Sequence, residues 1–321
     1  MLPATIPHGR TARRLSWVHL PPLVRRAVEQ RLGAPVVEAE SQRGGFTPGF
    51  ASVLTTADGS RMFVKAASVK AQRPFAESYR DESVVLADLP AAVPAPALVW
   101  AEEVEEWFVL ATEHVESRAP HRPWTDADLA AASAMALTTA DVLTPAPAAF
   151  ENTAEQEFGG WPALWSRLDH PRAAEIGALA AQFADVVAGD TLVHTDIRDD
   201  NILVRPDGTA VLCDWNWPVR GAAWLDSLLL LIGPRGDGLD VDAHIDAHPL
   251  LADVPPEHVD VFLALVLGYF TLSASQPTPR TSPYVRTAQA WQRDVLDDWL
   301  AERRGWDRQP PPDLGGRSRR C

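Results

Sequence analysis

The spacing of hydrophobic residues changes twice along the chain, and each change marks a different kind of structure. Apolar positions at helical spacing begin at Pro21 or Pro22 and stop at Gly33, which predicts one helix. From Pro35 the spacing becomes that of short strands, with one helix expected over Phe75–Leu89. The expected strands cover Val36–Ala39, Phe50–Thr55, Met62–Ala66, Ala97–Ala101 and Trp107–Thr112. This order of elements predicts a small α+β lobe built on an antiparallel sheet.

Beyond residue 112 the pattern is mainly helical. Thr125, followed by Asp126 and Asp128, has the composition of an N-cap with an acidic first turn, and predicts a helix to about Val142. Further helices are expected over Glu155–Leu168, Arg172–Val187, Ala223–Ile232, Glu257–Leu272 and Tyr284–Arg304. We therefore expect a bilobal α+β protein. Its parts are an N-terminal extension with one helix (1–34), a sheet lobe (35–115), a larger helical lobe (116–307) and a disordered tail (308–321).

The charge balance limits the class of partner. The 43 Asp and Glu residues exceed the 29 Lys and Arg residues, for a formal net charge of -14. A nucleic acid requires a basic face, so this balance argues against one and is compatible with a cationic or neutral small molecule. The same acidity is also expected in a protein that needs it for solubility alone.

The cysteines and apolar runs indicate the compartment. Cys213 lies inside an apolar strand and Cys321 at the end of the sequence, so they do not form a disulfide framework. No secretion signal is evident, and the apolar run Leu228–Ile232 is far shorter than the roughly 20 residues that span a bilayer. We expect a cytoplasmic protein with no membrane partner; its oligomeric state is not encoded in these patterns.

The densest cluster of chemical groups lies between Thr191 and Trp217. Apolar runs on either side of a Pro206-Asp207-Gly208 turn predict a hairpin, which would bring Asp196, Asn201 and Asp214 together. Converging oxygen ligands suit a hard cation such as magnesium with phosphate oxygens around it. The spacing is that of a phosphotransferase, with Asp196 beside the acceptor hydroxyl and Asn201 and Asp214 on the metal. The alternative is an ordinary turn rich in Asp and Asn.

A second group of candidates lies upstream. Gly44 and Gly45 occupy a break between two expected strands, where glycine lets the backbone approach phosphate oxygens. Lys65 ends an apolar strand in the same sheet, and Glu82 on the following helix can pair with it, with Glu77 as the fallback. Taken singly, the glycines fit a plain hairpin turn and the lysine fits a solvent-facing strand residue.

These motifs together resemble the aminoglycoside phosphotransferase family, the small-molecule branch of the protein-kinase-like fold. His194-Thr-Asp196-Ile-Arg-Asp-Asp-Asn201 resembles the catalytic loop of that family, and Asp214-Trp215 resembles its Asp-Trp pair. The glycine break from Arg43 to Gly49, Lys65 and Glu82 match the nucleotide-binding positions in order. The resemblance covers about residues 35 to 300.

The resemblance implies a bilobal kinase-like fold and transfer of a phosphoryl group from ATP, or GTP, with Mg²⁺. It implies that Asp196 is the catalytic base, that His194 orders the loop by hydrogen bonding, and that Asp226 caps the loop as a structural residue. Glu113, His114 and Val115 fall where the linker between lobes gives backbone hydrogen bonds to adenine. No Ala-Pro-Glu element follows Trp217, so protein substrates are disfavoured.

Two residues depart from the family pattern. Thr195 stands where many members have glycine, which is tolerable if its backbone is not at positive φ. Asn216 stands where many members have an acid, so its role as a metal ligand is open.

The acceptor also stays open. Asp199, Asp200 and the overall charge fit an aminoglycoside or another cationic or sugar-like molecule, and are equally expected on a solvated surface. Trp217 is the first choice to stack on such an acceptor. A catalytically inactive nucleotide-binding protein of the same fold is the alternative function.

Overall fold

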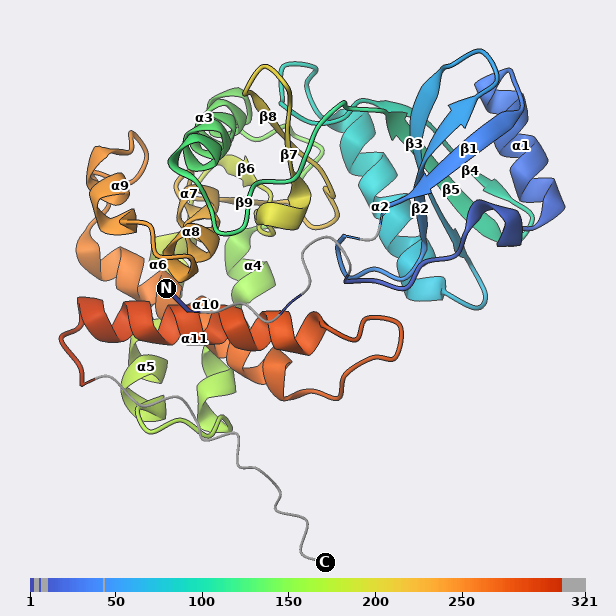
Figure 1. The fold of residues 1–321 in the computed structure, drawn as a ribbon. Coiled ribbons are helices and arrows are strands. Elements are labelled where there is room, and N and C mark those ends of the chain that lie inside the picture. Colours follow the sequence, from blue (N-terminus) through green and yellow to red (C-terminus); the bar gives the residue numbers. More distant parts are fainter. Residues whose placement is uncertain (3–5, 7–10, 43, 308–321) are drawn as a thin grey trace, which may run out of the picture.

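The computed structural model describes residues 1–2, 6, 11–42 and 44–307 and has two lobes (Figure 1). A sheet with two flanking helices forms the first lobe, and most of the remaining chain forms a larger, mainly helical lobe. This agrees with the expected α+β, bilobal fold class. Arg43 and the tail predicted for 308–321 lie outside the described residues.

The first lobe is a five-stranded sheet in the order β1-β2-β3-β5-β4, with every neighbouring pair antiparallel. The strands are β1 (Val36–Ser41), β2 (Phe50–Thr56), β3 (Arg61–Ser68), β4 (Leu98–Val104) and β5 (Trp107–Glu113). β1, β2, β3 and β5 cover the predicted stretches and extend one or two residues beyond them at one or both ends. β4 starts one residue later than predicted and ends three residues further along the chain.

Helices α1 (Pro22–Leu32) and α2 (Arg73–Asp88) cover opposite faces of this sheet (Figure 1). Alternate residues of a strand point to opposite faces, so Val64 and Ala66 of β3 join the apolar cluster under α1. Lys65, between them, faces α2 instead. The period of the strand therefore decides where the lysine of the candidate site lies.

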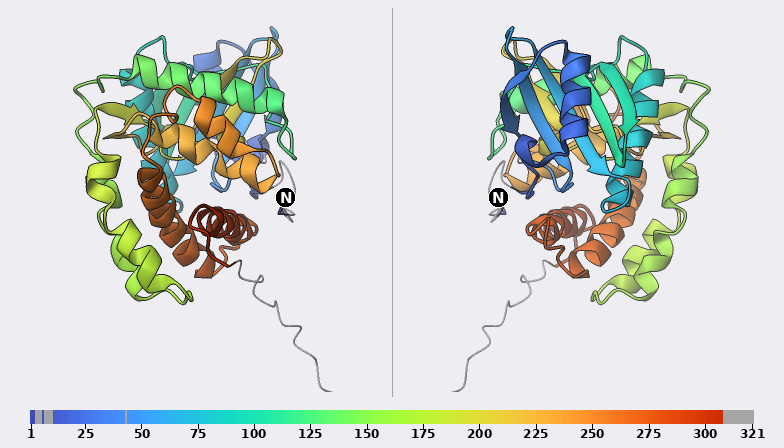
Figure 2. Two further views of the ribbon diagram at one scale, coloured as in Figure 1. Left: turned by 90° about the vertical axis from the view of Figure 1, so that its left-hand side faces the viewer. Right: turned by 90° about the vertical axis from the view of Figure 1, so that its right-hand side faces the viewer.

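The second lobe packs its helices around one large apolar core that includes Trp215, Phe262 and Trp299. Its α-helices are α3 (Asp126–Val142), α4 (Ala154–Phe158), α5 (Ala173–Ala180), α6 (Phe183–Val187), α7 (Leu225–Leu230), α8 (Ile232–Gly236), α9 (Val241–Ala247), α10 (Pro256–Ser275) and α11 (Val285–Arg303). Short 3-10 turns are η1 (Trp17–His19), η2 (Pro162–Ser166) and η3 (Asp199–Asn201). The long helices α10 and α11 lie against each other (Figure 2).

Several predicted helices are shorter than expected. The stretch 155–168 is divided into α4 and η2, because Gly159, Gly160 and Pro162 interrupt it. The stretch 172–187 is divided into α5 and α6, although neither proline nor glycine marks that break. The stretch 223–232 starts two residues later, as α7, and its last residue begins α8.

Two small ribbons carry the residues of the candidate site. The predicted hairpin is present as β7 (Ile202–Val204) and β8 (Ala210–Leu212). A second ribbon of β6 (Thr191–Val193) and β9 (Val219–Gly221) was not predicted, because three-residue strands carry too little periodicity. The ribbons fix both ends of the loop between β6 and β7 and of the segment between β8 and β9.

Helix α10 is long and apolar enough to cross a membrane by length and composition, with a mean hydropathy of 1.5. Of that apolar window, 61% is buried inside the fold, as in the core helix of a globular protein. The sequence-based expectation overlooked this longer apolar stretch and considered only Leu228–Ile232. The helix is weak evidence for a membrane segment.

We expect Gly189→Ala to lower the free energy of unfolding by about 2 kcal/mol. A Cβ at this position would lie 2.3 Å from the Gly221 carbonyl oxygen and 2.6 Å from the Ala222 backbone, so β6 and β9 would be forced apart. Gly160→Ala is the matched control, because nothing lies within 4 Å of its Cβ position, and should change stability by less than about 0.5 kcal/mol. Urea unfolding of both variants measures this, and equal stabilities would contradict the prediction.

Candidate active site

Lys65 lies between two carboxylates at the junction of the lobes. Its Nζ atom is 2.8 and 2.7 Å from the two carboxylate oxygens of Glu82 on α2, and 2.6 Å from Asp214 Oδ1 after β8. Lys65 and Glu82 are 9% and 3% exposed. The structure thus brings together three residues that are far apart in the sequence, and Glu82, not Glu77, is the partner. Glu77 pairs with Arg73 on the surface.

The pKa values of the triad formed by Lys65, Glu82 and Asp214 follow from burial and from the ion pairs among them. Burial alone would lower the pKa of Lys65, but Asp214 and Glu82 raise it well above its ordinary value, so the ammonium stays charged. Burial raises the pKa of Glu82 to about 7, although Lys65 opposes this shift. Burial would also raise the pKa of Asp214, but the Lys65 ammonium holds it well below its usual range. Two carboxylates therefore share one buried cation, and Asp214 is the more strongly acidic.

Asp196 and Asn201 face each other in the loop between β6 and β7. The Asn201 Nδ2 atom donates to the Asp196 backbone oxygen at 2.8 Å and to Asp196 Oδ2 at 3.0 Å. The Cys213 N–H donates to the Asn201 carbonyl at 2.9 Å, which sets Asn201 beside the start of the Asp214 segment. The structure therefore brings Asp196 and Asn201 into contact and places Asn201 against Cys213, the residue before Asp214.

His194 is held by both ring nitrogens. Its Nδ1 atom accepts a hydrogen bond from the Asp196 N–H at 3.2 Å, so Nε2 carries the proton and lies 3.1 Å from the Cys213 carbonyl oxygen. The ring is 2% exposed and packs edge-on against Trp215. Since neither nitrogen is free, the arrangement suits a residue that orders the loop and not one that exchanges a proton.

Asp226 of α7 holds the same loop from beneath. Its two carboxylate oxygens accept hydrogen bonds from the backbone N–H groups of His194 and Thr195, at 2.7 and 2.9 Å. The side chain is 6% exposed. The geometry is that of the structural role that the resemblance implies.

Threonine can replace glycine at position 195 without strain only if its φ is not positive, and the structure does not meet this condition. Its φ is +68°, in the left-handed region that disfavours β-branched residues. The Asp226 carboxylate and a 3.1 Å hydrogen bond from Thr195 Oγ1 to the Trp217 carbonyl keep it there. The replacement of glycine by threonine is thus strained, and neighbouring contacts compensate for the strain. Asp214 also has a positive φ, of +69°.

Asn216 is directed toward the other lobe. Its side-chain oxygen accepts a hydrogen bond from Ser78 Oγ of α2 at 3.0 Å, and the residue is 8% exposed. The oxygen that a metal would need is therefore engaged by α2. The residue links the segment after β8 to the sheet lobe.

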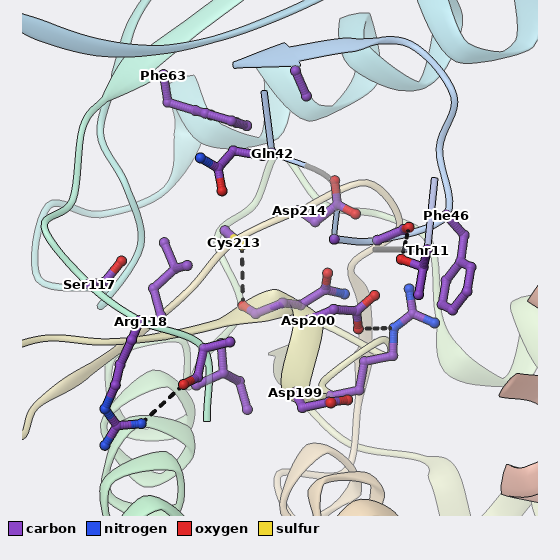
Figure 3. Close-up of a pocket in the computed structure, with 18 of the residues that line it drawn as sticks. Thr11, Gln42, Phe46, Phe63, Ser117, Arg118, Asp199, Asp200, Cys213 and Asp214 are labelled. Carbon is purple, nitrogen blue, oxygen red and sulfur yellow. Dashed lines mark hydrogen bonds and ion pairs between the residues drawn. The ribbon is translucent and has the colours of Figure 1, made fainter. Parts of the chain in front are cut away.

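Lys65, Glu82, Asn201 and Asp214 line a cleft of about 900 Å³ between the lobes, part of which is shown in Figure 3, whereas Asp196 lines a smaller pocket. Asp214, Asp200, Phe46 and Thr11 lie together at one end of the part shown, with Phe63 and Ser117 toward the other. Gly44 and Gly45 line the same cleft, and Gly45 has a φ of +71° that favours glycine. The glycine break therefore lies where its backbone can meet a ligand.

The linker after β5 also lines this cleft. The Glu113 N–H is already bonded to the Ala97 carbonyl at 2.9 Å. The Val115 N–H has no hydrogen-bond partner among the described residues, while the Val115 carbonyl accepts from Ser117. Among the three predicted linker positions, the Glu113 N–H is therefore occupied, whereas Val115 has a backbone donor available.

The oxygen atoms near Asp214 fit a divalent cation of the hard type. The Asn201 side-chain nitrogen is used by Asp196, which leaves Oδ1 for a ligand, and only Oδ1 of Asp214 contacts Lys65. No cluster of three His, Cys, Asp or Glu side chains in the described ranges could hold a metal alone. Two protein ligands with phosphate and water completing the shell is the pattern that suits magnesium.

Two arginines in the site were not identified from the sequence. Arg198 lies 2.8 Å from Asp200 Oδ1 and 3.3 Å from Asp196 Oδ1. Arg122 lies 2.9 Å from Asp199 and 2.7 Å from Asp237, with its guanidinium over the Trp291 ring. For Arg198 a signal was available, since it stands between acids inside the loop motif; Arg122 lies 77 residues from Asp199, and no local pattern marks it.

We expect Thr195→Gly to be more stable than Thr195→Ala by about 1 kcal/mol, because both lose the hydroxyl but only glycine relieves the left-handed strain. Thr138, exposed on α3, provides the control, since at a helical position alanine should exceed glycine by about 1 kcal/mol. Urea unfolding of the four variants tests this. The same alanine-over-glycine order at both positions would refute the strain at Thr195.

Solved structures of known proteins are similar to this chain over most of its length. The aminoglycoside phosphotransferase from Alicyclobacillus acidocaldarius is 16% identical and matches over 89% of this chain and 96% of that chain, with a TM-score of 0.57. The choline kinase LicA from Streptococcus pneumoniae is 13% identical over 88% and 99%, with a TM-score of 0.62. A thermostable mutant of aminoglycoside phosphotransferase APH(4)-Ia, in ternary complex with ADP and hygromycin B, is 13% identical over 87% and 98%, with a TM-score of 0.60.

At these identities the structural likeness shows the fold alone. No curated protein matches the sequence. A family model described as the phosphotransferase enzyme family matches residues 48–257, well over half of the chain. The chain therefore belongs to the phosphotransferase enzyme family, and its fold is that of the solved aminoglycoside phosphotransferase and choline kinase structures.

Proposed function

We propose that the protein transfers the γ-phosphoryl group of ATP, or of GTP, to a hydroxyl group of a small molecule. The observation that carries this proposal is the set of paired charges in the cleft. Lys65 is fixed by Glu82 and Asp214, and the Asn201 side chain is hydrogen-bonded to Asp196. Family membership supports phosphotransfer, and the relative in complex with ADP supports a nucleotide as the donor.

In the proposed reaction the acceptor hydroxyl lies beside Asp196. Its oxygen forms a bond to the γ-phosphorus while the bond from that phosphorus to the β–γ bridging oxygen breaks, and ADP leaves with the electron pair. The hydroxyl proton passes to the Asp196 carboxylate. His194 does not compete for this proton, because both of its nitrogens are engaged.

The other residues bind and orient the phosphates. Magnesium bound to Asn201 Oδ1 and the Asp214 carboxylate would neutralise charge on the β- and γ-phosphates. Lys65 offers its ammonium to the phosphate oxygens, and Glu82 keeps it in place through two contacts. Gly44, Gly45 and the Val115 N–H offer backbone groups to the phosphates and the base.

The alternatives receive less support. An inactive nucleotide-binding protein would not need Lys65, Asp196, Asn201 and Asp214 together, and all four are in place. A protein kinase is disfavoured because only a short segment separates Trp217 from α7.

The space next to Asp196 suggests the nature of the acceptor. A narrow pocket of about 40 Å³ adjoins Asp196, with Trp124, Phe270 and Trp291 among its walls. Asp199 and Asp200, which suggested a cationic acceptor in the sequence, share their arginines with other acids, since Arg122 also contacts Asp237 and Arg198 also contacts Asp196. Four carboxylates therefore share two guanidinium groups, and this surplus of acid favours a cationic or sugar-like acceptor that carries amino groups.

Asp196→Asn should reduce phosphotransfer by about 100-fold or more, because the amide cannot accept the hydroxyl proton, while Mg²⁺-ATP binding persists. Asp246→Asn, at an exposed acid on α9, is the control and should transfer normally. Radiolabelled ATP with an acceptor panel, with water as the fallback acceptor, measures the rates. Undiminished transfer by Asp196→Asn would overturn the mechanism, and tight Mg²⁺-ATP binding by the wild type without transfer to any acceptor would favour the inactive alternative.

The acceptor assignment has its own test. In a thermal-shift screen with Mg²⁺-ATP, aminoglycosides and amino alcohols should raise the melting temperature more than uncharged sugars. The physical reason is that Asp196, Asp199, Asp200 and Asp237 share only two arginines, so the region keeps a negative charge. A larger shift with the uncharged sugars would show that the two arginines neutralise these acids and would contradict the assignment.

A further inference from the structure

The segment at Thr11–Arg14 reaches the nucleotide side of the cleft from outside the part of the chain that matches the family, residues 48–257. The Arg14 Nη2 atom donates to the Gly44 carbonyl at 2.8 Å, and the Thr11 hydroxyl donates to the Gly45 carbonyl. Both side chains line the cleft. Figure 3 shows Thr11 beside Phe46, at the end of the cavity that holds Asp214 and Asp200.

The same region is anchored to the helical lobe. The Arg13 N–H donates to the Thr281 carbonyl at 3.2 Å, in the connection between α10 and α11. From this connection the Ser282 hydroxyl donates to the Phe46 carbonyl, and Ser282 is 4% exposed. The glycine break is therefore held from two sides, so the position of Arg14 beside it is fixed.

Arg14 differs from the other arginines that line the cleft. Arg118, Arg122 and Arg198 each form an ion pair with an aspartate. Arg14 is half-buried and has no carboxylate partner in the described part of the chain, and Arg61, also without one, is exposed. The Nε atom of Arg14 is buried without a hydrogen-bond partner. A half-buried cation with one hydrogen bond to a carbonyl oxygen retains donors for an anion.

The cleft needs such a cation if it binds nucleotide phosphates. The ammonium of Lys65 is already shared between Glu82 and Asp214. Asp200 also faces the glycine break, since a Cβ on Gly45 would lie 3.9 Å from Asp200 Oδ2 and 3.3 Å from Arg14 Nη2. A polyphosphate placed below this break would meet these acids, so a second, unshared positive charge beside Gly45 offsets the repulsion.

We propose that Arg14 binds the phosphates of the nucleotide, as a second cation that works beside Lys65. Its guanidinium keeps the bond to the Gly44 carbonyl and offers its remaining N–H groups to non-bridging phosphate oxygens. This inference rests on the proposed nucleotide site. It adds to that site a residue supplied by the chain before α1.

The test compares ADP with adenosine, which carries the same base and sugar without phosphates. Arg14→Met, which keeps the length of the side chain but removes its charge, should weaken ADP binding about tenfold and leave adenosine binding unchanged. Arg14→Lys should bind ADP with intermediate affinity. Arg13→Met is the matched control, because the neighbouring Arg13 side chain is exposed, and should bind both ligands like the wild type. Isothermal titration calorimetry of the full chain gives these affinities.

Three results would overturn the inference, and they are distinguishable. Wild-type affinity of Arg14→Met for ADP shows that Arg14 binds no phosphate, while the proposed function stands. Equal weakening of ADP and adenosine shows that Arg14 only anchors the glycine break. Failure of the wild type to bind ADP at all overturns the nucleotide site itself, and with it the proposed function. Thermal unfolding of each variant confirms that it is folded.

Discussion

The structure depends most on a buried cation that the two lobes share. Lys65 is contributed by β3, Glu82 by α2 and Asp214 by the segment after β8, so one ammonium joins the sheet lobe to the hairpin of the helical lobe. Buried charges are stable only when they are paired, and loss of one partner leaves the others uncompensated. Because two carboxylates share a single cation, the triad retains an attraction for further positive charge.

The helical lobe positions its half of the site by holding the short loop between β6 and β7 with several hydrogen bonds at once. Asp226 accepts two backbone hydrogen bonds, both ring nitrogens of His194 form hydrogen bonds, and Asn201 donates to Asp196. These contacts compensate for the left-handed backbone at Thr195 and fix the direction of Asp196. Ser78 of α2 donates a hydrogen bond to Asn216, which lies in the segment after β8. Lys65 contacts the same segment through Asp214. The neutral Asn216 amide thus adds a hydrogen bond to the contact between the lobes that Lys65 and Asp214 form as an ion pair.

Local patterns predicted much of this arrangement. The alternation in β3, the left-handed Gly33 after α1 and the Thr125 cap of α3 gave elements close to those observed. The spacing of Asp196, Asn201 and Asp214 predicted their convergence, because a tight hairpin leaves few other geometries. What failed depends on distant partners: the backbone of Thr195 is set by an aspartate 31 residues later, and the pairing of Arg122 with Asp237 spans 115 residues. Three-residue strands such as β6 and β9 likewise form only because each pairs with the other.

The composition of α10 has a consequence for how the chain folds during synthesis. Most of its apolar window is covered in the finished protein, by α5 and α6, which precede it, and by α11, which follows it. A ribosome releases α10 before α11, so the face that α11 covers is exposed to solvent during that interval. An apolar helix of this length, uncovered on one side, is a binding site for chaperones and for other nascent chains. The last helix therefore completes the core of the second lobe, and the yield of folded protein depends on how soon it docks.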